Sequence, residues 1–162
     1  MKTKIPFVGM VLTLVLSTLT FVQAKDEVRV TYPSKVESSK GKEREKLFGP
    51  WMSSADLVKQ TQEKRGKGEQ LIYFEYDGAK DQQRAIYTNK VKLTGPYSHW
   101  VYLSEPAMEE KLSSEVKRGL EPAFIVRNPN GSTALLMVSP GDLVAVRAEL
   151  KLLGIGEPKL KK

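Results

Sequence analysis

The sequence predicts an α/β protein, a three-layer sandwich in which helices cover both faces of a mixed central sheet. Two observations carry this prediction. Apolar runs that fit buried strands alternate with segments whose apolar residues recur at helical spacing, which implies parallel crossovers. Near the C-terminal end, two apolar runs flank an Asn-Pro-Asn-Gly turn, which is typical of an antiparallel hairpin.

The first predicted helix and strand have clear local signals. Ser53 and Asp56 form a capping-box pattern, and the helix that follows is expected to end near Lys64, before a Gly-Lys-Gly sequence. Residues 71–74 are a continuous apolar run bounded by charge, which predicts a strand buried on both faces. After an Asp-Gly break, a second helix is expected at residues 80–91.

The next two elements follow a Gly-Pro turn. Residues 100–103 predict a strand, and Pro106 lies in the first turn of a third helix, where its missing N–H costs nothing. The apolar stripe of that helix is Met108, Leu112 and Val116, and a glycine ends it at position 119.

The hairpin and the last helix complete the predicted domain. Residues 123–126 and 133–138 are its two strands, and the first of them is expected to be central in the sheet. Pro140 begins a helix with an apolar face that ends at Gly154. The predicted α/β domain therefore covers residues 51–154.

The first 24 residues have the pattern of a secretory signal peptide. Lys2 and Lys4 precede an apolar stretch that ends in the small-x-small sequence before Lys25. The alternative is an uncleaved membrane anchor. The chain has no cysteine, so an exported form cannot rely on disulfides, and we expect a periplasmic or extracellular setting.

Two polar segments flank the predicted domain. In the lead-in, residues 25–50, a short strand is expected at 28–32, and residues 34–46 have the composition of a loose, partly disordered segment. Residues 155–162 form a basic tail. The chain carries a net charge of +7, but acids are interspersed in the lead-in and no aromatics interleave, so no specific nucleic-acid partner is expected.

The residue types exclude several reactions. No thiolate can form, which removes disulfide exchange and cysteine-based peroxide reduction. His99 is the single histidine, so neither a zinc site nor a Ser-His-Asp triad is expected. Asp77 and Asp81 are explained by the dipole of the second predicted helix. The sequence predicts no catalytic residue, metal or cofactor.

The stretch Arg118-Gly-Leu-Glu-Pro122, the hydrophobic strand after it and the Gly-containing turn resemble the thioredoxin-like fold. Val138-Ser-Pro-Gly-Asp142 and Trp51 before a helix are similar to the same family, in its exported bacterial form. The resemblance places the family's two redox cysteines near Ala79 and Gln82, where this chain has none. It therefore implies the family's shape without its redox activity.

The resemblance also implies a binding site. It makes the Glu121–Pro122 bond cis and places it against the loop at residues 77–82, where the family receives a polypeptide. Tyr73 and Trp100 either add aromatic surface there or lie in the core. The implied peptide-binding residues are Tyr76, Asp77, Gly78, Ala79, Gln82, Glu121 and Pro122.

Three functions remain open at this point. The chain is expected to be a redox-inactive domain that binds a protein or an extended peptide. The alternatives are a basic surface-binding protein that works through its positive termini, or a non-redox enzyme that uses His99 and nearby carboxylates. A pocket that joins His99 to Asp77 or Asp81 favours the enzyme, and a groove beside Pro122 favours the binding domain.

Overall fold

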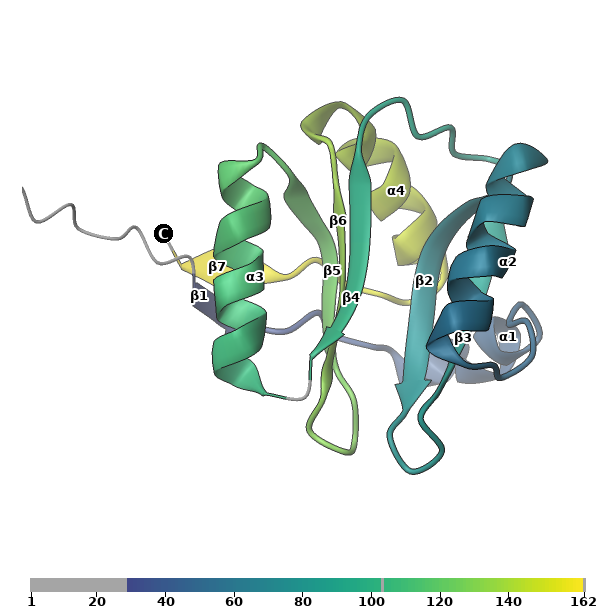
Figure 1. The fold of residues 1–162 in the computed structure, drawn as a ribbon, viewed down its shortest axis with the longest axis horizontal. Helices are drawn as coiled ribbons and strands as arrows, with labels where there is room; N and C mark the ends of the chain where they lie inside the picture. The colour runs from purple at the N-terminus through teal and green to yellow at the C-terminus, as the bar shows by residue number, and fades with distance from the viewer. Residues whose placement is uncertain (1–28, 103, 162) are drawn as a thin grey trace, which may run out of the picture.

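The helices and strands are arranged as in Figure 1, a computed structural model that describes residues 29–102 and 104–161. The helical segments are η1 (Ser38–Lys40), α1 (Gly41–Glu45), α2 (Ser54–Gly66), α3 (Glu105–Lys117) and α4 (Pro140–Leu152). The strands are β1 (Arg29–Tyr32), β2 (Gln70–Asp77), β3 (Gln82–Thr88), β4 (Tyr97–Tyr102), β5 (Glu121–Arg127), β6 (Thr133–Val138) and β7 (Lys159–Lys161). The predicted mixed α/β class is confirmed.

In the described residues, all hydrogen-bonded strand pairs are antiparallel. β1 pairs with β7, β2 pairs with β3, and β6 lies between β4 and β5. Because β4 and β5 both oppose β6, they run parallel to each other, and α3 connects them. The expected parallel crossover is therefore present here, with one hairpin strand between its two strands.

β6 is the centre of the three-stranded sheet, and all its residues are buried. Its side chains alternate between two apolar clusters, as a strand covered on both faces requires. Leu135 and Met137 pack with Met108 and Leu112 of α3. The intervening residues of β6 belong to the larger cluster, which includes β2 and α4.

β5 was predicted to be central, but it is an edge strand of the three-stranded sheet. Ile125 is nevertheless buried, because its side chain packs in the cluster under α3. The lead-in covers the outer backbone edge of β5. The Ser34 N–H donates to the Ile125 carbonyl at 2.6 Å, and the Ile125 N–H donates to Ser34 Oγ at 3.1 Å. The lead-in, which is distant in sequence, thus supplies hydrogen bonds to the outer edge of β5, the edge that does not face β6.

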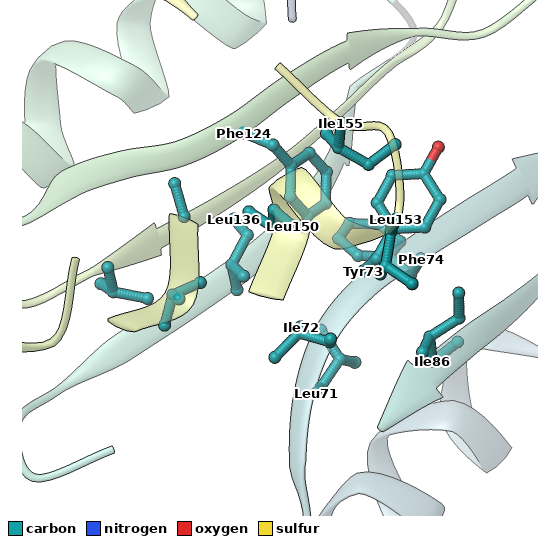
Figure 2. Close-up of a cluster of buried hydrophobic side chains, with 14 of the residues drawn as sticks. Leu71, Ile72, Tyr73, Phe74, Ile86, Phe124, Leu136, Leu150, Leu153 and Ile155 are labelled. Carbon is teal, nitrogen blue, oxygen red and sulfur yellow. The ribbon is translucent and has the colours of Figure 1, made fainter. Parts of the chain in front are cut away.

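The larger cluster joins the β2–β3 hairpin to the three-stranded sheet (Figure 2). Tyr73 and Phe74 of β2 face Phe124 of β5, with ring centroids 5.1 and 5.5 Å apart. Leu136 of β6 and Leu150 of α4 lie in the same cluster. Tyr73 is therefore a core residue, the second of the two roles expected for it.

The predicted second helix at residues 80–91 is wrong, because β3 occupies most of that range. Its Gln, Arg and Ala residues are good helix formers, but β3 is paired on both edges. β2 lies on one side, and on the other Met52 and Gln83 exchange two backbone hydrogen bonds of 2.8 Å. The Gly49 N–H donates to the Ala85 carbonyl at 3.0 Å. Tertiary pairing thus overrides the local preference.

The lead-in also differs from the loose segment that its composition predicts. Residues 38–45 are helical and pack against the C-terminal end of α4. Lys40 Nζ donates to the Leu152 carbonyl at 3.2 Å, and the buried Arg44 donates to the Leu153 carbonyl at 2.9 Å. These cations satisfy carbonyl groups that the end of a helix leaves without partners.

A buried carboxylate fixes the loop before β4 to the N-terminal end of α4. Asp142 accepts hydrogen bonds from the N–H and hydroxyl of Thr94, the N–H of Gly95 and the hydroxyl of Ser139, at 2.7–3.1 Å. Burial by itself raises the pKa of Asp142, but these hydrogen bonds outweigh burial and lower the pKa to about 2.

The predicted signal peptide, residues 1–24, lies outside the described residues. In the part of the chain that is described, no helix is both long and apolar enough to cross a membrane. The tail expected at residues 155–162 includes β7, which pairs with β1.

Candidate functional site

The turns of two hairpins lie side by side at one end of the molecule (Figure 1). Gly78, in the β2–β3 turn, is so close to Asn130, in the β5–β6 turn, that a Cβ atom at position 78 would overlap the Asn130 amide. The Asn130 side chain is itself held, because its Oδ1 accepts from the Ser132 N–H at 3.2 Å and from the Ser132 hydroxyl at 2.7 Å. The two turns therefore form one continuous surface.

A groove of about 530 Å³ lies beside these two turns, and we call it the hairpin groove. Most of the surface that lines it is apolar. It is formed by the lead-in, by β2 and its turn, and by the end of β5 and its turn. Its lining residues are Val36, Trp51, Tyr73, Glu75, Tyr76, Asp77, Gly78, Ala79, Val126, Arg127, Asn128, Pro129 and Asn130.

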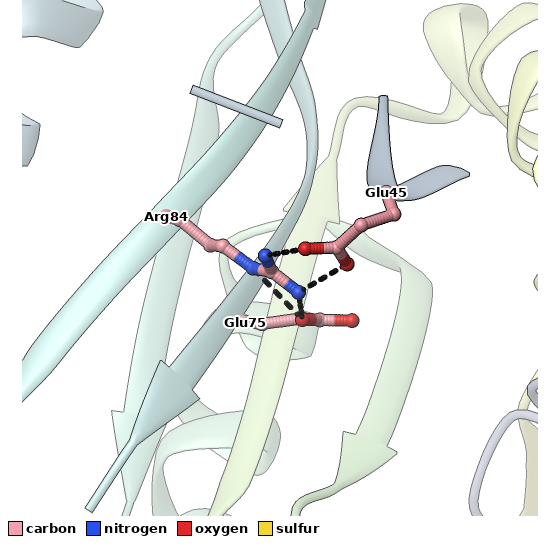
Figure 3. Close-up of polar contacts among 3 residues, drawn as sticks. All are labelled: Glu45, Glu75 and Arg84. Atoms are coloured by element: carbon pink, nitrogen blue, oxygen red, sulfur yellow. Dashed lines mark hydrogen bonds and ion pairs between the residues drawn. The ribbon is translucent and has the colours of Figure 1, made fainter. Parts of the chain in front are cut away.

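One wall of the hairpin groove is held by Arg84 of β3, which joins two carboxylates (Figure 3). Its Nη2 donates to Glu75 Oε2 and to Glu45 Oε2, each at 2.8 Å. The guanidinium lies 4.0 Å from the centre of the Phe48 ring and 4.6 Å from that of Trp51. The hydrogen bond from Arg84 lowers the pKa of Glu45. Arg84 thus pairs with Glu75 and Glu45 together and orients Trp51.

The carboxylate of Asp77 organises its own turn. Asp77 Oδ1 accepts the Ala79 N–H at 3.0 Å, and Lys80 Nζ lies 3.8 Å from Asp77 Oδ2. Asp81 has a φ of 51°, a left-handed conformation that Asp tolerates better than most residues. The helix dipole invoked for Asp77 and Asp81 is absent, since a hairpin turn and a strand follow instead.

The structure divides the predicted peptide-binding residues into two groups. Those at positions 76–79 line the hairpin groove. Gln82 does not line it, because it begins β3 and pairs with Asp77. Glu121 and Pro122 lie at the other end of β5, away from both turns.

The expected cis proline is also wrong. No described peptide bond is cis, and the Glu121–Pro122 bond is therefore trans. Pro122 is a buried residue at the start of β5, opposite Met137, and its carbonyl accepts from Arg147 Nη2 at 3.1 Å. The position of Pro122 is explained by strand pairing and by this contact with α4.

The site predicted from the sequence included only residues 76–79 of the hairpin groove and missed most of its lining. The Asn128–Asn130 turn was predicted as a turn but not as part of a site. The available signal was the presence of two tight turns, Asp-Gly and Asn-Pro-Asn-Gly, each after an apolar strand. Nothing in their local sequence shows that they meet.

A second cavity, of about 370 Å³, lies between α2, the β2–β3 hairpin and β4, and we call it the edge cleft. It joins His99 to Asp81, the arrangement that favours an enzyme. Its lining residues are Ser54, Leu57, Val58, Tyr76, Asp81, Gln83, His99, Trp100 and Val101. Tyr76 lines both the edge cleft and the hairpin groove.

The polar groups of the edge cleft are partly engaged. The Tyr76 hydroxyl donates to Asp81 Oδ1 at 3.0 Å, and this hydrogen bond raises the pKa of Tyr76. The half-buried His99 ring packs against Phe74 and Tyr97, with centroid distances of 5.6 and 6.3 Å. Burial lowers the pKa of His99, so its imidazole is neutral at pH 7.

Comparison with protein-family models, with curated proteins and with solved structures finds no match to this chain. Across the residues that the structure describes, no group of three or more His, Cys, Asp or Glu side chains is arranged to hold a metal ion.

Proposed function

We propose that this chain is an exported, redox-inactive protein that binds an extended segment of another protein in the hairpin groove. The observation that carries the proposal is a mostly apolar groove of about 530 Å³ beside two hairpin turns that are in contact with each other. Aromatic side chains on a rigid scaffold are typical anchors of protein recognition. Trp51 and Tyr76 supply them here.

The charges along the groove support a peptide rather than a strongly ionic ligand. Glu75 is paired with Arg84, which also binds Glu45, and Arg127 Nη2 lies 3.2 Å from Glu105 Oε2. Val36 and Val126 offer apolar contacts beside them. An occupant with alternating apolar and polar side chains matches this lining.

The thioredoxin-like fold stays a proposal. It is supported by the order β4, α3, β5, β6, α4 and by a sheet covered by helices on both faces. The trans Glu121–Pro122 bond and the strand at 82–88 remove the two features that tied the resemblance to a particular site. The hairpin groove therefore rests on its own geometry.

Tryptophan fluorescence tests the groove directly, because each of the two tryptophans lies in a different cavity. Decapeptides selected from a random library on the purified protein are titrated against the Trp100→Phe variant, in which Trp51 is the reporter. We expect a saturable change in Trp51 fluorescence. In calorimetric titrations, which do not need Trp51 as a reporter, Trp51→Ala should bind the same peptides at least about tenfold more weakly. Selected peptides that bind Trp51→Ala as tightly as the parent protein contradict the proposal.

A second candidate function is acid–base catalysis in the edge cleft, favoured by the cavity that joins His99 to Asp81. A neutral imidazole at pH 7 can accept a proton. Hydrolysis of p-nitrophenyl acetate at pH 7, compared between the protein and His99→Ala, tests it. Equal rates for the two proteins contradict this candidate.

The third candidate, a basic surface-binding protein, has less support in the lead-in than its composition suggests. Lys40 and Arg44 are engaged with the end of α4 rather than available to a partner. Binding to anionic vesicles that falls steeply with added salt would favour this candidate.

A further inference from the structure

The outer edge of β4 has backbone groups available for pairing. The β4–β6 ladder is regular over all its residues, whereas each of the other three ladders contains a register shift. The Asn128 N–H donates to the Ser132 carbonyl, which fixes the alternation along β5 and β6. It follows that the N–H and C=O groups of His99 and Val101 point away from β6.

In the part of the chain that the structure describes, no other strand is hydrogen-bonded to this edge, and β2 contacts it only through side chains, with the Phe74 and His99 ring centroids 5.6 Å apart. β5 has Ser34 on its outer edge, and β3 has Gly49 and Met52. No described backbone group is hydrogen-bonded to the outward groups of β4. The sequence of β4, Tyr-Ser-His-Trp-Val-Tyr, also has none of the lysines, prolines or bulges that usually protect an edge strand.

The edge cleft lies along this edge and offers apolar contacts. Trp100 is 41% exposed and Val58 of α2 is 47% exposed, and both line the cleft. Lys111 of α3 lies over the Trp100 ring, 4.1 Å from its centre, and forms an ion pair with the buried Glu115. Lys111 therefore orients Trp100, and it shares Glu115 with Arg118.

Opposite charges flank the two ends of β4. Arg65, in the last turn of α2, lies over the ring of Tyr97, 5.1 Å from its centre, at the beginning of β4. Within the described chain, Arg65 has no carboxylate partner. Asp81 also lines the cleft, as does Val101 near the other end of β4. Figure 1 shows the C-terminal end of α2 near the start of β4 and the β2–β3 turn toward its end.

We propose that the edge cleft binds an extended peptide segment that adds to β4 as an antiparallel strand, with a basic residue beside Asp81 and an acidic residue four positions later beside Arg65. Four residues of a strand span about 13 Å, the length from Val101 to Tyr97. Open strand edges take peptides in this way, and side-chain contacts then select the sequence. Among the lining residues, the site shares only Tyr76 with the hairpin groove.

The probe is acetyl-Lys-Thr-Val-Thr-Glu-amide, titrated into the Trp51→Phe variant so that Trp100 is the reporter. We expect a saturable fluorescence change and slower amide hydrogen exchange at His99 and Val101. Acetyl-Lys-Thr-Pro-Thr-Glu-amide, which lacks the central N–H, and the reversed peptide acetyl-Glu-Thr-Val-Thr-Lys-amide are expected to bind at least about threefold more weakly. No binding of the probe at millimolar concentration overturns the proposal, and so does unchanged exchange at His99 and Val101.

A charge exchange tests the polarity of the cleft. In Arg65→Glu, affinity for the probe should fall about fivefold, and affinity for acetyl-Lys-Thr-Val-Thr-Lys-amide should rise by a similar factor. Lys59→Glu is the matched control, because it makes the same charge change on the exposed surface of α2, outside the cleft lining. In Lys59→Glu, the ratio of the affinity for the probe to the affinity for acetyl-Lys-Thr-Val-Thr-Lys-amide should be the same as in the parent protein. If both variants shift that ratio equally, or neither does, the proposed position of the acidic residue is overturned.

Discussion

Gly78 and Asn130 lie in contact across two hairpin turns, and no side chain fits between them. Gly78 follows β2 and Asn130 follows β5, so their contact joins the turn of the β2–β3 hairpin to the β5–β6 turn of the three-stranded sheet. The hairpin groove depends on this junction, because residues on both sides of it form the lining.

Gly78→Ala is expected to lower the free energy of unfolding by about 1–2 kcal/mol, since the new methyl group displaces Asn130 from its hydrogen bonds to Ser132. Urea denaturation measures the change. Gly66→Ala is the control, because nothing lies within 4 Å of a Cβ atom there and the residue ends a helix. An equal effect of the two substitutions would show that the two turns are not in contact.

Ile125→Ala should cost on the order of 2–5 kcal/mol, because the side chain is buried between β6 and α3. Val144→Ala is the surface control, since Val144 is 80% exposed and its truncation should change stability by less than about 0.5 kcal/mol. Chemical denaturation of both variants tests the packing of α3 on the sheet. A loss below about 0.5 kcal/mol for Ile125→Ala would mean that this face of β5 is not covered.

Asp142 predicts a loss of stability in acid. Its pKa is about 2 in the folded protein, below the ordinary value of 3.8, so the folded state favours the ionised carboxylate. The contribution of about 2 kcal/mol is fully present above pH 4 and is lost as the pH falls through about 2. Unfolding measured between pH 6 and pH 2 should show this loss. In Asp142→Asn that part of the pH dependence should disappear, and a curve identical to that of the parent protein would contradict the assignment.

The signal-peptide prediction is tested by export. The N-terminal sequence of protein recovered outside the cytoplasm should begin near Lys25, after the small-x-small sequence. A membrane-bound product that retains Met1 would instead support the anchor.

Local sequence signals predicted most of the helices and strands, because they depend on neighbouring residues. The apolar run of β6 and the hairpin turn before it were readable, as was the capping serine of α2, whose side chain accepts the Asp56 N–H at 3.2 Å. β3 was missed because its strand conformation depends on Met52 and Gly49, about thirty residues away in sequence.

The site was harder to predict than the fold. The Asp77-Gly78 turn was identified as a candidate, but its partner was taken to be Pro122 and is instead the Asn128–Asn130 turn. The β2–β3 turn lies near one end of β5 and not the other. This arrangement depends on the direction of β2 relative to β5, which the packing of Tyr73 and Phe74 on Phe124 fixes. The relative direction of two strands that are not hydrogen-bonded to each other leaves no periodic pattern in the sequence, so it could not be predicted.

Ser34 covers the outer edge of β5, and Gly49 and Met52 cover that of β3, which has a practical consequence for fragments of the protein. A fragment that starts at Trp51, where the sequence places the domain boundary, lacks Ser34 and Gly49. The edge of β5 is then uncovered, and the edge of β3 keeps only Met52. Unprotected strand edges pair with other chains, so this fragment should aggregate where a fragment that starts before Ser34 stays monodisperse. We therefore expect the folding unit to begin ahead of Ser34, within the polar segment whose composition alone predicts no packed structure.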